Sequence, residues 1–167
     1  MGHIEHRAAA PASVRCVVLT VSDTRSLEDD TSGRAIADLL AGAGHVVADR
    51  RLLADDPAAV RAFVARQIDE AAIDAVITTG GTGVSSRDST FEAVTGLLEK
   101  RLDGFGELFR MLSYHQIGPA AMLSRACAGT AHGTIVIALP GSEHAVRLAM
   151  EKLVLPELGH LVREARK

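Results

Sequence analysis

The segment Thr78–Asp88, TTGGTGVSSRD, combines three glycines with hydroxyl side chains and a closing acid. Gly80, Gly81 and Gly83 lack a Cβ atom, so the backbone there can adopt positive φ and approach a ligand closely. Successive backbone N–H groups in such a loop form a concavity that binds anions. A plain tight turn is the alternative, because glycine-rich turns are common. The density of Ser and Thr favours phosphate binding.

This glycine loop lacks the signatures of two common nucleotide-binding loops. A P-loop needs a Gly-Lys-Ser/Thr ending, which the chain does not contain. The dinucleotide fingerprint needs a further glycine at position 86, where the chain has Ser86. A phosphate bound here would therefore be held by a different type of loop.

Two acids could act beside a phosphate. Asp88 could cap the helix that follows it, which is worth about 1 kcal/mol, or it could share a Mg²⁺ ion with phosphate oxygens. Arg87 could pair with the phosphate or with Asp88. Asp55 has the same ambiguity, but Asp56 before Pro57 is the better placed cap and leaves Asp55 free.

Alternating strand and helix patterns must position these groups. Short apolar, β-branched segments predict buried strands over 14–21, 75–79 and 133–139, and 45–53 is a fourth strand candidate. Helical spacing predicts helices over 33–43, 57–72, 104–116, 119–123 and 143–165, and the last should bend at Pro156. A further helix should begin after Asp88 or Ser89, with Glu92 completing a capping box at its start. This order predicts an α/β fold, a mostly parallel central sheet covered on both faces as an α/β/α sandwich.

Ligands of open α/β sheets bind beyond the carboxyl ends of the strands. Polar groups follow each predicted parallel strand: Ser22 and Asp23, then Asp55, the glycine loop, and Pro140-Gly141-Ser142. Ser124 and Arg125 precede a small-residue strand candidate, and Arg125 is either an anion contact or a surface charge. Glu28-Asp29-Asp30 is predicted to be a solvated loop.

Composition excludes several functional classes. A net charge of −3 with 3% aromatic residues argues against a nucleic-acid partner. No apolar run approaches the roughly 20 residues that span a membrane. Cys16 and Cys127 are predicted to be buried and reduced, which suits the cytoplasm. Residues 1–13, with His3 and His6, are predicted to form a flexible arm before a single domain over 14–167.

Five blocks together resemble one family: TVSDTRSLEDDTSG (20–33), TTGGTGVSSRDST (78–90), GFGELFRMLS (104–113), SRACAG (124–129) and ALPGS (138–142). They resemble the MoaB/Mog family of molybdenum cofactor biosynthesis proteins, its MoaB branch in particular. The resemblance implies a three-layer α/β domain that adenylylates molybdopterin with ATP and Mg²⁺ and releases pyrophosphate. It also implies that Asp55 and Asp88 are the catalytic pair and position the metal.

The resemblance further implies how the substrates are held. Gly80, Gly81, Thr82 and Gly83, with Pro140, Gly141 and Ser142, would hold the pterin and its phosphate, Ser22 and Asp23 would border the nucleotide, and Ser124 and Arg125 would complete the substrate contacts. A hexamer of paired trimers is expected rather than a trimer. A non-catalytic molybdopterin-binding or scaffold protein of the same pathway is the alternative function.

Overall fold

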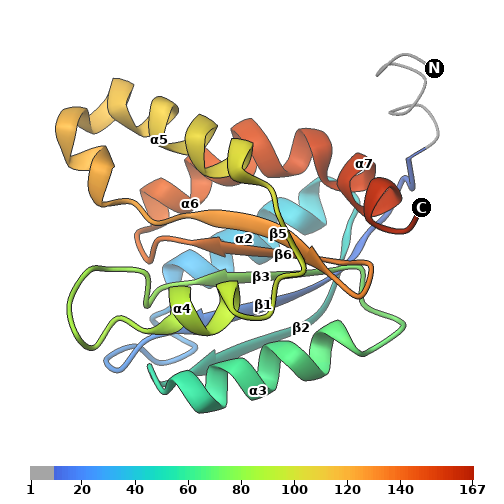
Figure 1. Ribbon diagram of the computed structural model, residues 1–167, viewed down its shortest axis with the longest axis horizontal. Helices are drawn as coiled ribbons and strands as arrows, with labels where there is room; N and C mark the ends of the chain where they lie inside the picture. The colour runs from blue at the N-terminus through green and yellow to red at the C-terminus, as the bar shows by residue number, and fades with distance from the viewer. Residues whose placement is uncertain (1–9) are drawn as a thin grey trace.

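The computed structural model describes residues 10–167, and Figure 1 shows a central sheet with helices on both sides. Within this range six strands follow the order β2-β1-β3-β6-β5-β4. Their bounds are β1 Arg15–Val21, β2 Val46–Leu53, β3 Ala75–Thr79, β4 Lys100–Arg101, β5 Cys127–Ala131 and β6 Thr134–Leu139. The predicted α/β fold is confirmed. Most of the predicted arm falls on residues 1–9, which lie outside the described residues.

The sheet is parallel on one side and antiparallel on the other. Strands β2, β1, β3 and β6 pair in parallel, whereas β5 pairs antiparallel with both β6 and β4. A tight turn joins β5 to β6, with His132 at φ 48° and Gly133 at φ 79°. The two-residue strand β4 was not predicted, because it is too short to show a hydrophobic pattern.

Helices cover the two faces unequally. One face packs against α2 (Thr31–Gly42), α5 (Asp103–Ile117), α6 (Glu143–Ala149) and α7 (Leu155–Ala165). The other face packs against α3 (Pro57–Ile68) and α4 (Thr90–Thr95), which lie in the lower half of Figure 1. A 3₁₀ segment, Gly118–Leu123, follows α5. Within residues 10–167, no helix has the length and apolar character needed to cross a membrane.

The final helix was predicted to bend at Pro156, and the structure shows a π-helical turn just before this residue. Five residues, Met150–Val154, form a π-helical turn between α6 and α7. Pro156 then stands in the first turn of α7, where its missing N–H matters least. The wider turn therefore lets the chain accommodate Pro156 without ending the helix.

The predicted solvated loop at Glu28–Asp30 is wrong at its last residue. Asp30 is fully buried. It caps α2 by accepting a hydrogen bond from the N–H of Gly33, and it accepts others from Thr20 Oγ1 at 2.6 Å and Arg50 Nη2 at 2.9 Å. These long-range partners leave no trace in the local pattern of acids.

The predicted capping box before α4 is also wrong. Ser89 is the N-cap residue, but its side chain makes no capping hydrogen bond. Glu92 forms an ion pair with Arg125 instead of reaching back to the cap. Asp88 therefore does not serve as the cap of this helix, and its carboxylate is engaged in the glycine loop described below.

Candidate functional site

The carboxyl ends of β1, β3 and β6 meet at one edge of the sheet. From β1 the chain runs first to β2 on one side and then to β3 on the other, so the strand order reverses here. Such switch points are where α/β sheets bind ligands. A cavity of about 340 Å³ lies at this edge and is lined by Ser22, Arg25, Gly80, Gly81, Gly141 and Ser142, among others.

The structure thus brings five of the predicted substrate-binding residues around one cavity. The other six do not line it: Asp23, Thr82, Gly83, Ser124, Arg125 and Pro140. Thr82 is buried, and Pro140 contributes a carbonyl that accepts a hydrogen bond from Thr79 Oγ1 at 2.7 Å. Thr82 and Pro140 therefore support the loops around the cavity and do not line it.

The first two glycines of the loop are required by its geometry. Gly80 has φ 95°, and a Cβ there would lie 2.2 Å from the carbonyl oxygen of Val21. Gly81 has φ 63°, and a Cβ there would lie 2.1 Å from Thr90 Oγ1. Both positive φ and the lack of space exclude a larger residue. The loop therefore packs directly against β1 and the start of α4.

Asp55 lies behind the glycine loop. Its Oδ1 accepts hydrogen bonds from Ser89 Oγ at 3.1 Å and Thr90 Oγ1 at 3.3 Å. Its backbone N–H donates to Asp23 Oδ1 at 2.9 Å. Asp56 caps α3 by accepting hydrogen bonds from the N–H groups of Ala58 and Ala59, as predicted. The Asp55 carboxylate is therefore not used as a helix cap.

Asp88 closes the other end of the loop. Its Oδ2 accepts hydrogen bonds from Ser85 Oγ at 2.6 Å and from the Ser85 backbone N–H at 3.0 Å. The pKa of Asp88 is lowered, chiefly by the Ser85 hydroxyl, and desolvation is the next largest effect and opposes the lowering. The N–H groups of Ser85 and Gly83 and the charge of Arg125 add to the lowering. The side chain is thus held as a carboxylate.

The two carboxylates stand at successive glycines of the same loop. A Cβ at Gly81 would lie 3.0 Å from Asp55 Oδ2, and one at Gly83 would lie 2.5 Å from Asp88 Oδ2. Within residues 10–167, no basic side chain forms an ion pair with Asp55, and its Oδ2 has no hydrogen-bond partner. Two acids beside an anion-binding loop thus retain acceptor capacity for a cation.

These donors fit Mg²⁺. The ion prefers oxygen ligands and binds through one or two carboxylates together with substrate phosphates. No group of three or more His, Cys, Asp or Glu in the described part of the chain could hold a metal by itself. Two carboxylates are enough for a Mg²⁺ site that substrate oxygens complete, but too few for a site made of protein ligands alone.

Arg25 supplies a positive charge that the sequence analysis missed. Its Nη1 donates to the carbonyl oxygen of Gly141 at 3.2 Å and to Ser32 Oγ at 3.1 Å, and the side chain lines the cavity. Ser32 Oγ also donates to Gly141 at 2.7 Å. The sequence feature that could have identified Arg25 is its position, as a basic residue in the polar turn after a buried strand.

Arg125, unlike Arg25, does not line the cavity and contacts the glycine loop instead. Its guanidinium donates to the carbonyl oxygens of Thr82, at 2.9 Å, and Gly83, and pairs with Glu92. It also stacks over the ring of Phe91, 4.8 Å from the centroid. Arg125 therefore holds the glycine loop in place through two of its carbonyl groups. The neighbouring Ser124 has a buried Oγ with no partner among the described residues.

Two hydroxyl groups at the cavity stabilise turns. Ser22 Oγ accepts hydrogen bonds from the N–H groups of Thr24 and Arg25, at 3.3 and 3.1 Å. Ser142 Oγ caps α6 by accepting from the N–H of Ala145 at 3.2 Å. Both side chains order the rim of the cavity and can still offer a proton to a ligand.

Similar proteins bear on this arrangement. A family model described as a probable molybdopterin binding domain matches residues 17–160. The molybdenum cofactor biosynthesis protein B of Bacillus subtilis is 50% identical over 164 residues, which cover 98% of this chain and 96% of that protein. The corresponding protein of Bacillus cereus is 49% identical over 165 residues, 98% of each chain.

Solved structures show the same fold. The tungsten cofactor synthesizing protein MoaB of Pyrococcus furiosus superposes with a TM-score of 0.85 at 35% identity, over 95% of this chain and 100% of that chain. A molybdenum cofactor biosynthesis protein B superposes with a TM-score of 0.90 at 49% identity, over 94% of this chain and 98% of that one. The chain therefore belongs to the MoaB/Mog family of molybdenum cofactor biosynthesis proteins.

Proposed function

We propose that this protein adenylylates molybdopterin with Mg-ATP. In this reaction an oxygen of the terminal phosphate of molybdopterin attacks the α-phosphorus of ATP. A new P–O bond forms, the bond from the α-phosphorus to the oxygen bridging it to the β-phosphorus breaks, and the electron pair leaves with pyrophosphate. The products are adenylylated molybdopterin and pyrophosphate. No protein nucleophile is required.

The observation that carries this proposal is the placement of Asp55 and Asp88 at Gly81 and Gly83 of one loop. Two phosphates that react must approach despite their charges, so cations and N–H donors must offset the repulsion. Without a metal ion, the two adjacent carboxylates would repel a phosphate and weaken its binding to the glycine loop. Their presence is explained if a metal ion joins them to the phosphates.

The residues of the site would divide this work. Backbone N–H groups of the glycine loop would bind the phosphate of molybdopterin, with Gly141 and Ser142 facing them across the cavity. Arg25 would offset negative charge on the nucleotide side, next to Ser22. Asp55 and Asp88 would hold Mg²⁺, which when bound withdraws charge from the phosphates. Catalysis of this type depends on positioning more than on a strong base.

The test is to incubate the purified protein with molybdopterin, ATP and Mg²⁺ and to measure adenylylated pterin and pyrophosphate. Wild type should form both. Asp88→Asn and Asp55→Asn should each lower kcat by about a hundredfold or more, the loss typical of a transition-state electrostatic group. Asp56→Asn is the matched control, because asparagine also caps a helix well. It should keep full activity.

Three outcomes would contradict the proposal in whole or in part. A wild-type protein that binds molybdopterin and forms no product would be the non-catalytic binding or scaffold protein. Full activity in Asp88→Asn would keep the enzyme but remove Asp88 from its site. ATP binding without any affinity for molybdopterin would indicate a nucleotide-binding protein of another kind.

We further propose that the chain assembles as a hexamer. The outer face of α5 and the segment after it expose several large apolar side chains: Leu108, Met111, Tyr114, Ile117, Met122 and Leu123. Each of them is at least 48% exposed, and Met122 is 75% exposed. Contiguous apolar surface of this kind favours contact with another chain, and a second copy is the partner that the family resemblance implies.

A further inference from the structure

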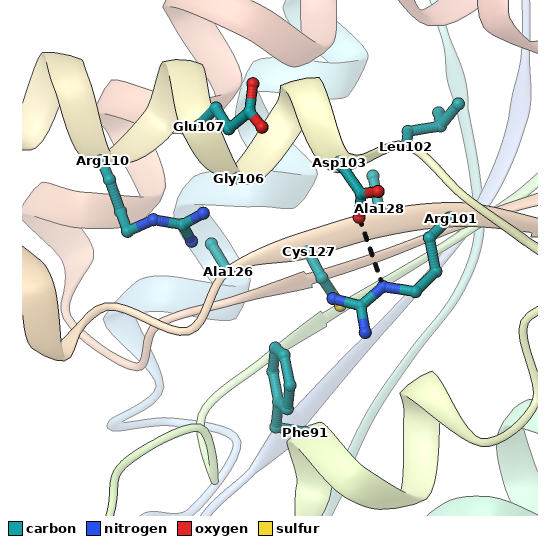
Figure 2. Close-up of a pocket in the computed structure, with 10 residues that line it drawn as sticks. All are labelled: Phe91, Arg101, Leu102, Asp103, Gly106, Glu107, Arg110, Ala126, Cys127 and Ala128. Atoms are coloured by element: carbon teal, nitrogen blue, oxygen red, sulfur yellow. Dashed lines mark ion pairs between the residues drawn. The ribbon is translucent and has the colours of Figure 1, made fainter.

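The switch-point cavity has a more one-sided charge than a second cavity nearby in the fold. Of the residues within 10–167 that line the switch-point cavity, Arg25 is the charged one. The second cavity, of about 240 Å³, lies beside α5, and Figure 2 shows Arg101 paired with Asp103 at its rim. Glu107 and Arg110 lie along α5 in the same view. Its charges balance, so the switch-point cavity is the better of the two for an anion.

Two buried hydroxyl groups hold the turn after β6, residues 140–142, which forms one wall of the switch-point cavity. Thr79 Oγ1 donates to the carbonyl oxygen of Pro140 at 2.7 Å, and Ser32 Oγ donates to that of Gly141, also at 2.7 Å. Both side chains are fully buried, and they lie 61 and 109 residues away from their partners along the chain. Two consecutive carbonyl groups are thus fixed by long-range contacts.

Ser32 is itself held in place by the start of α2. Asp30 caps this helix and accepts a hydrogen bond from Thr20 Oγ1 at 2.6 Å, which fixes the first helical turn against β1. The Ser32 hydroxyl also accepts a hydrogen bond from Arg25 Nη1 at 3.1 Å. Arg25 Nη1 lies 3.2 Å from the carbonyl oxygen of Gly141 and donates to it as well. Ser32 therefore joins the guanidinium to the turn, and its buried hydroxyl has both a donor and an acceptor partner.

The fixed carbonyl groups set the direction of two backbone N–H groups. No peptide bond in the described part of the chain is cis, so each N–H points away from the C=O of its own peptide group. The N–H groups of Gly141 and Ser142 therefore point away from Thr79 and Ser32. Neither donates a hydrogen bond within residues 10–167, and both residues line the cavity. Two adjacent N–H donors beside a guanidinium suit an oxyanion.

Glycine at position 141 brings this turn against the glycine loop. A Cβ at Gly141 would lie 3.3 Å from the Cα atom of Gly80, so a larger residue would press the two backbones apart. The N–H of Gly80 also donates to the carbonyl oxygen of Leu139 at 3.1 Å. The turn and the glycine loop therefore form adjoining walls of one cavity.

We propose that Ser32 and Thr79 are positioning residues, which hold the N–H groups of Gly141 and Ser142 toward a phosphate in the cavity. Both act through the turn, because their hydroxyl groups are engaged with its carbonyl groups. Donors that are already oriented need no rearrangement when the charged group arrives. The inference rests on the proposed function for the identity of the substrates, whose phosphates share this chemistry.

The first test uses wild-type protein and tripolyphosphate, which has phosphate oxygens and neither a pterin nor an adenine ring. Backbone amide NMR spectra are recorded during a titration in the presence of Mg²⁺. The amide protons of Gly141 and Ser142 should move downfield as they donate to phosphate oxygens. An absence of binding, or binding that leaves these two resonances unchanged, would overturn the inference.

The second test removes the hydroxyl groups. Thr79→Val keeps the shape of the side chain, and Thr79→Ser keeps its hydroxyl. Thr79→Val and Ser32→Ala should each weaken tripolyphosphate binding about fivefold, the net effect of one hydrogen bond, measured by calorimetry. Thr79→Ser should bind like wild type. Equal weakening in Thr79→Val and Thr79→Ser would show that the hydroxyl is not what matters.

Thr78→Val is the matched control. Thr78 is as buried as Thr79 and lies beside it in β3, but its Oγ1 donates to the carbonyl oxygen of Ile137 within β6, at 3.4 Å. This variant should unfold at a lower temperature than wild type and bind tripolyphosphate equally well. If Thr78→Val weakens binding as much as Thr79→Val does, the effect comes from packing of the strand and the positioning role is rejected.

Steady-state kinetics distinguish the two sources of the phosphate. If the turn holds the phosphate of molybdopterin, Thr79→Val and Ser32→Ala should raise the KM for molybdopterin about fivefold and leave the KM for ATP unchanged. The reverse pattern would assign the turn to ATP. Either pattern supports the positioning role, and an unchanged KM for both substrates would contradict it.

Failure of this inference and failure of the proposed function give different results. Tripolyphosphate binding that depends on Ser32 and Thr79, in a protein that forms no adenylylated product, would reject the enzyme and keep the positioning role. Normal adenylylation in both Ser32→Ala and Thr79→Val, with unchanged affinity for tripolyphosphate, would keep the enzyme and reject the positioning role.

Discussion

The backbone N–H of Asp55 donates a hydrogen bond to Asp23 Oδ1 at 2.9 Å, which ties the turn after β2 to the turn after β1. A second bond, from the N–H of Ser22 to the carbonyl oxygen of Leu53 at 2.9 Å, continues the same connection. The Asp55 carboxylate is thus positioned by the turn that borders the neighbouring cavity. We therefore expect Asp23 to act through Asp55, as a positioning residue that does not touch a substrate.

Asp23→Ala should therefore lower activity without preventing substrate binding. Loss of the carboxylate frees the backbone of Asp55, so we expect kcat to fall about 10- to 100-fold, as for other groups that orient a metal ligand. The KM for ATP should change less than kcat, and the Mg²⁺ concentration for half-maximal activity should rise. Asp29→Ala, on the same polar segment, is the control. Equal kcat in both variants would show that Asp23 has no positioning role.

The hydrogen bond from Ser85 Oγ to Asp88 predicts a pH effect. The Ser85 hydroxyl is the main reason that the pKa of Asp88 is lowered. Ser85→Ala should raise this pKa toward the ordinary value of about 3.9, so that Asp88 becomes protonated at a higher pH. The acid limb of kcat/KM should move to higher pH, while activity at pH 7 changes little because Asp88 remains ionised there.

Ser86→Ala tests whether the pH effect is specific. Ser86 is exposed in the same loop, and its side chain makes no hydrogen bond within residues 10–167. Its substitution should leave the acid limb in place. If Ser85→Ala also leaves it in place, ionisation of Asp88 does not limit the reaction at low pH.

Arg125 should act as a positioning residue. Its guanidinium meets two loop carbonyls and Glu92 at once, a geometry that the single ammonium of lysine cannot reproduce. Arg125→Lys should therefore increase hydrogen exchange of the amides of residues 82–88 and lower kcat. Glu92→Gln should have a smaller effect, because Arg125 keeps its carbonyl acceptors. A variant with lower activity and unchanged exchange would mean that Arg125 contacts the substrate instead.

Local patterns were sufficient to predict the strands that build the site. Val14–Val21 and Ala75–Thr79 are mostly apolar because parallel strands are buried on both faces, and every residue in them except Arg15 is buried. The sites after such strands converge, so Asp55, the glycine loop and Ser142 could be placed on one edge. No structural observation tests their roles in binding or catalysis, which stay predictions.

Contacts between distant segments could not be predicted in this way. Asp30 looked like one of three solvated acids, yet Arg50 and Thr20 make it a buried ion pair and hydrogen-bond centre. The role of Glu92 was misassigned for the same reason, because its partner Arg125 is 33 residues away. Periodicity reports the face on which a residue lies and carries no information about which polar partner will meet it there.

The buried Asp30 predicts a pH-dependent loss of stability. Burial alone would raise the pKa of Asp30, but hydrogen bonds from Thr20, Gly33 and Arg50 outweigh it and leave the pKa lowered. A lowered folded-state pKa contributes stability above the unfolded value, about 3.9. That contribution is lost as the pH falls through the folded-state value.

Asp30→Asn removes the charge and leaves Arg50 with an unpaired, largely buried guanidinium. We expect the free energy of unfolding at pH 7 to fall by about 3 kcal/mol, measured by urea denaturation. The difference from wild type should shrink as the pH falls below about 4. Asp29→Asn, at the exposed neighbouring position, should unfold like wild type. An unchanged Asp30→Asn would show that the ion pair contributes nothing net.

The apolar face of α5 predicts a change of assembly. Met111 is 51% exposed and lies on that face together with Leu108, which is 48% exposed. If copies of the chain meet there, Met111→Lys places a charge in a desolvated contact, and the sedimentation coefficient should drop from that of a hexamer to that of a smaller species. Val84→Lys is the control, since Val84 is also exposed but lies in the glycine loop. A hexamer that persists in Met111→Lys would place the subunit contact elsewhere.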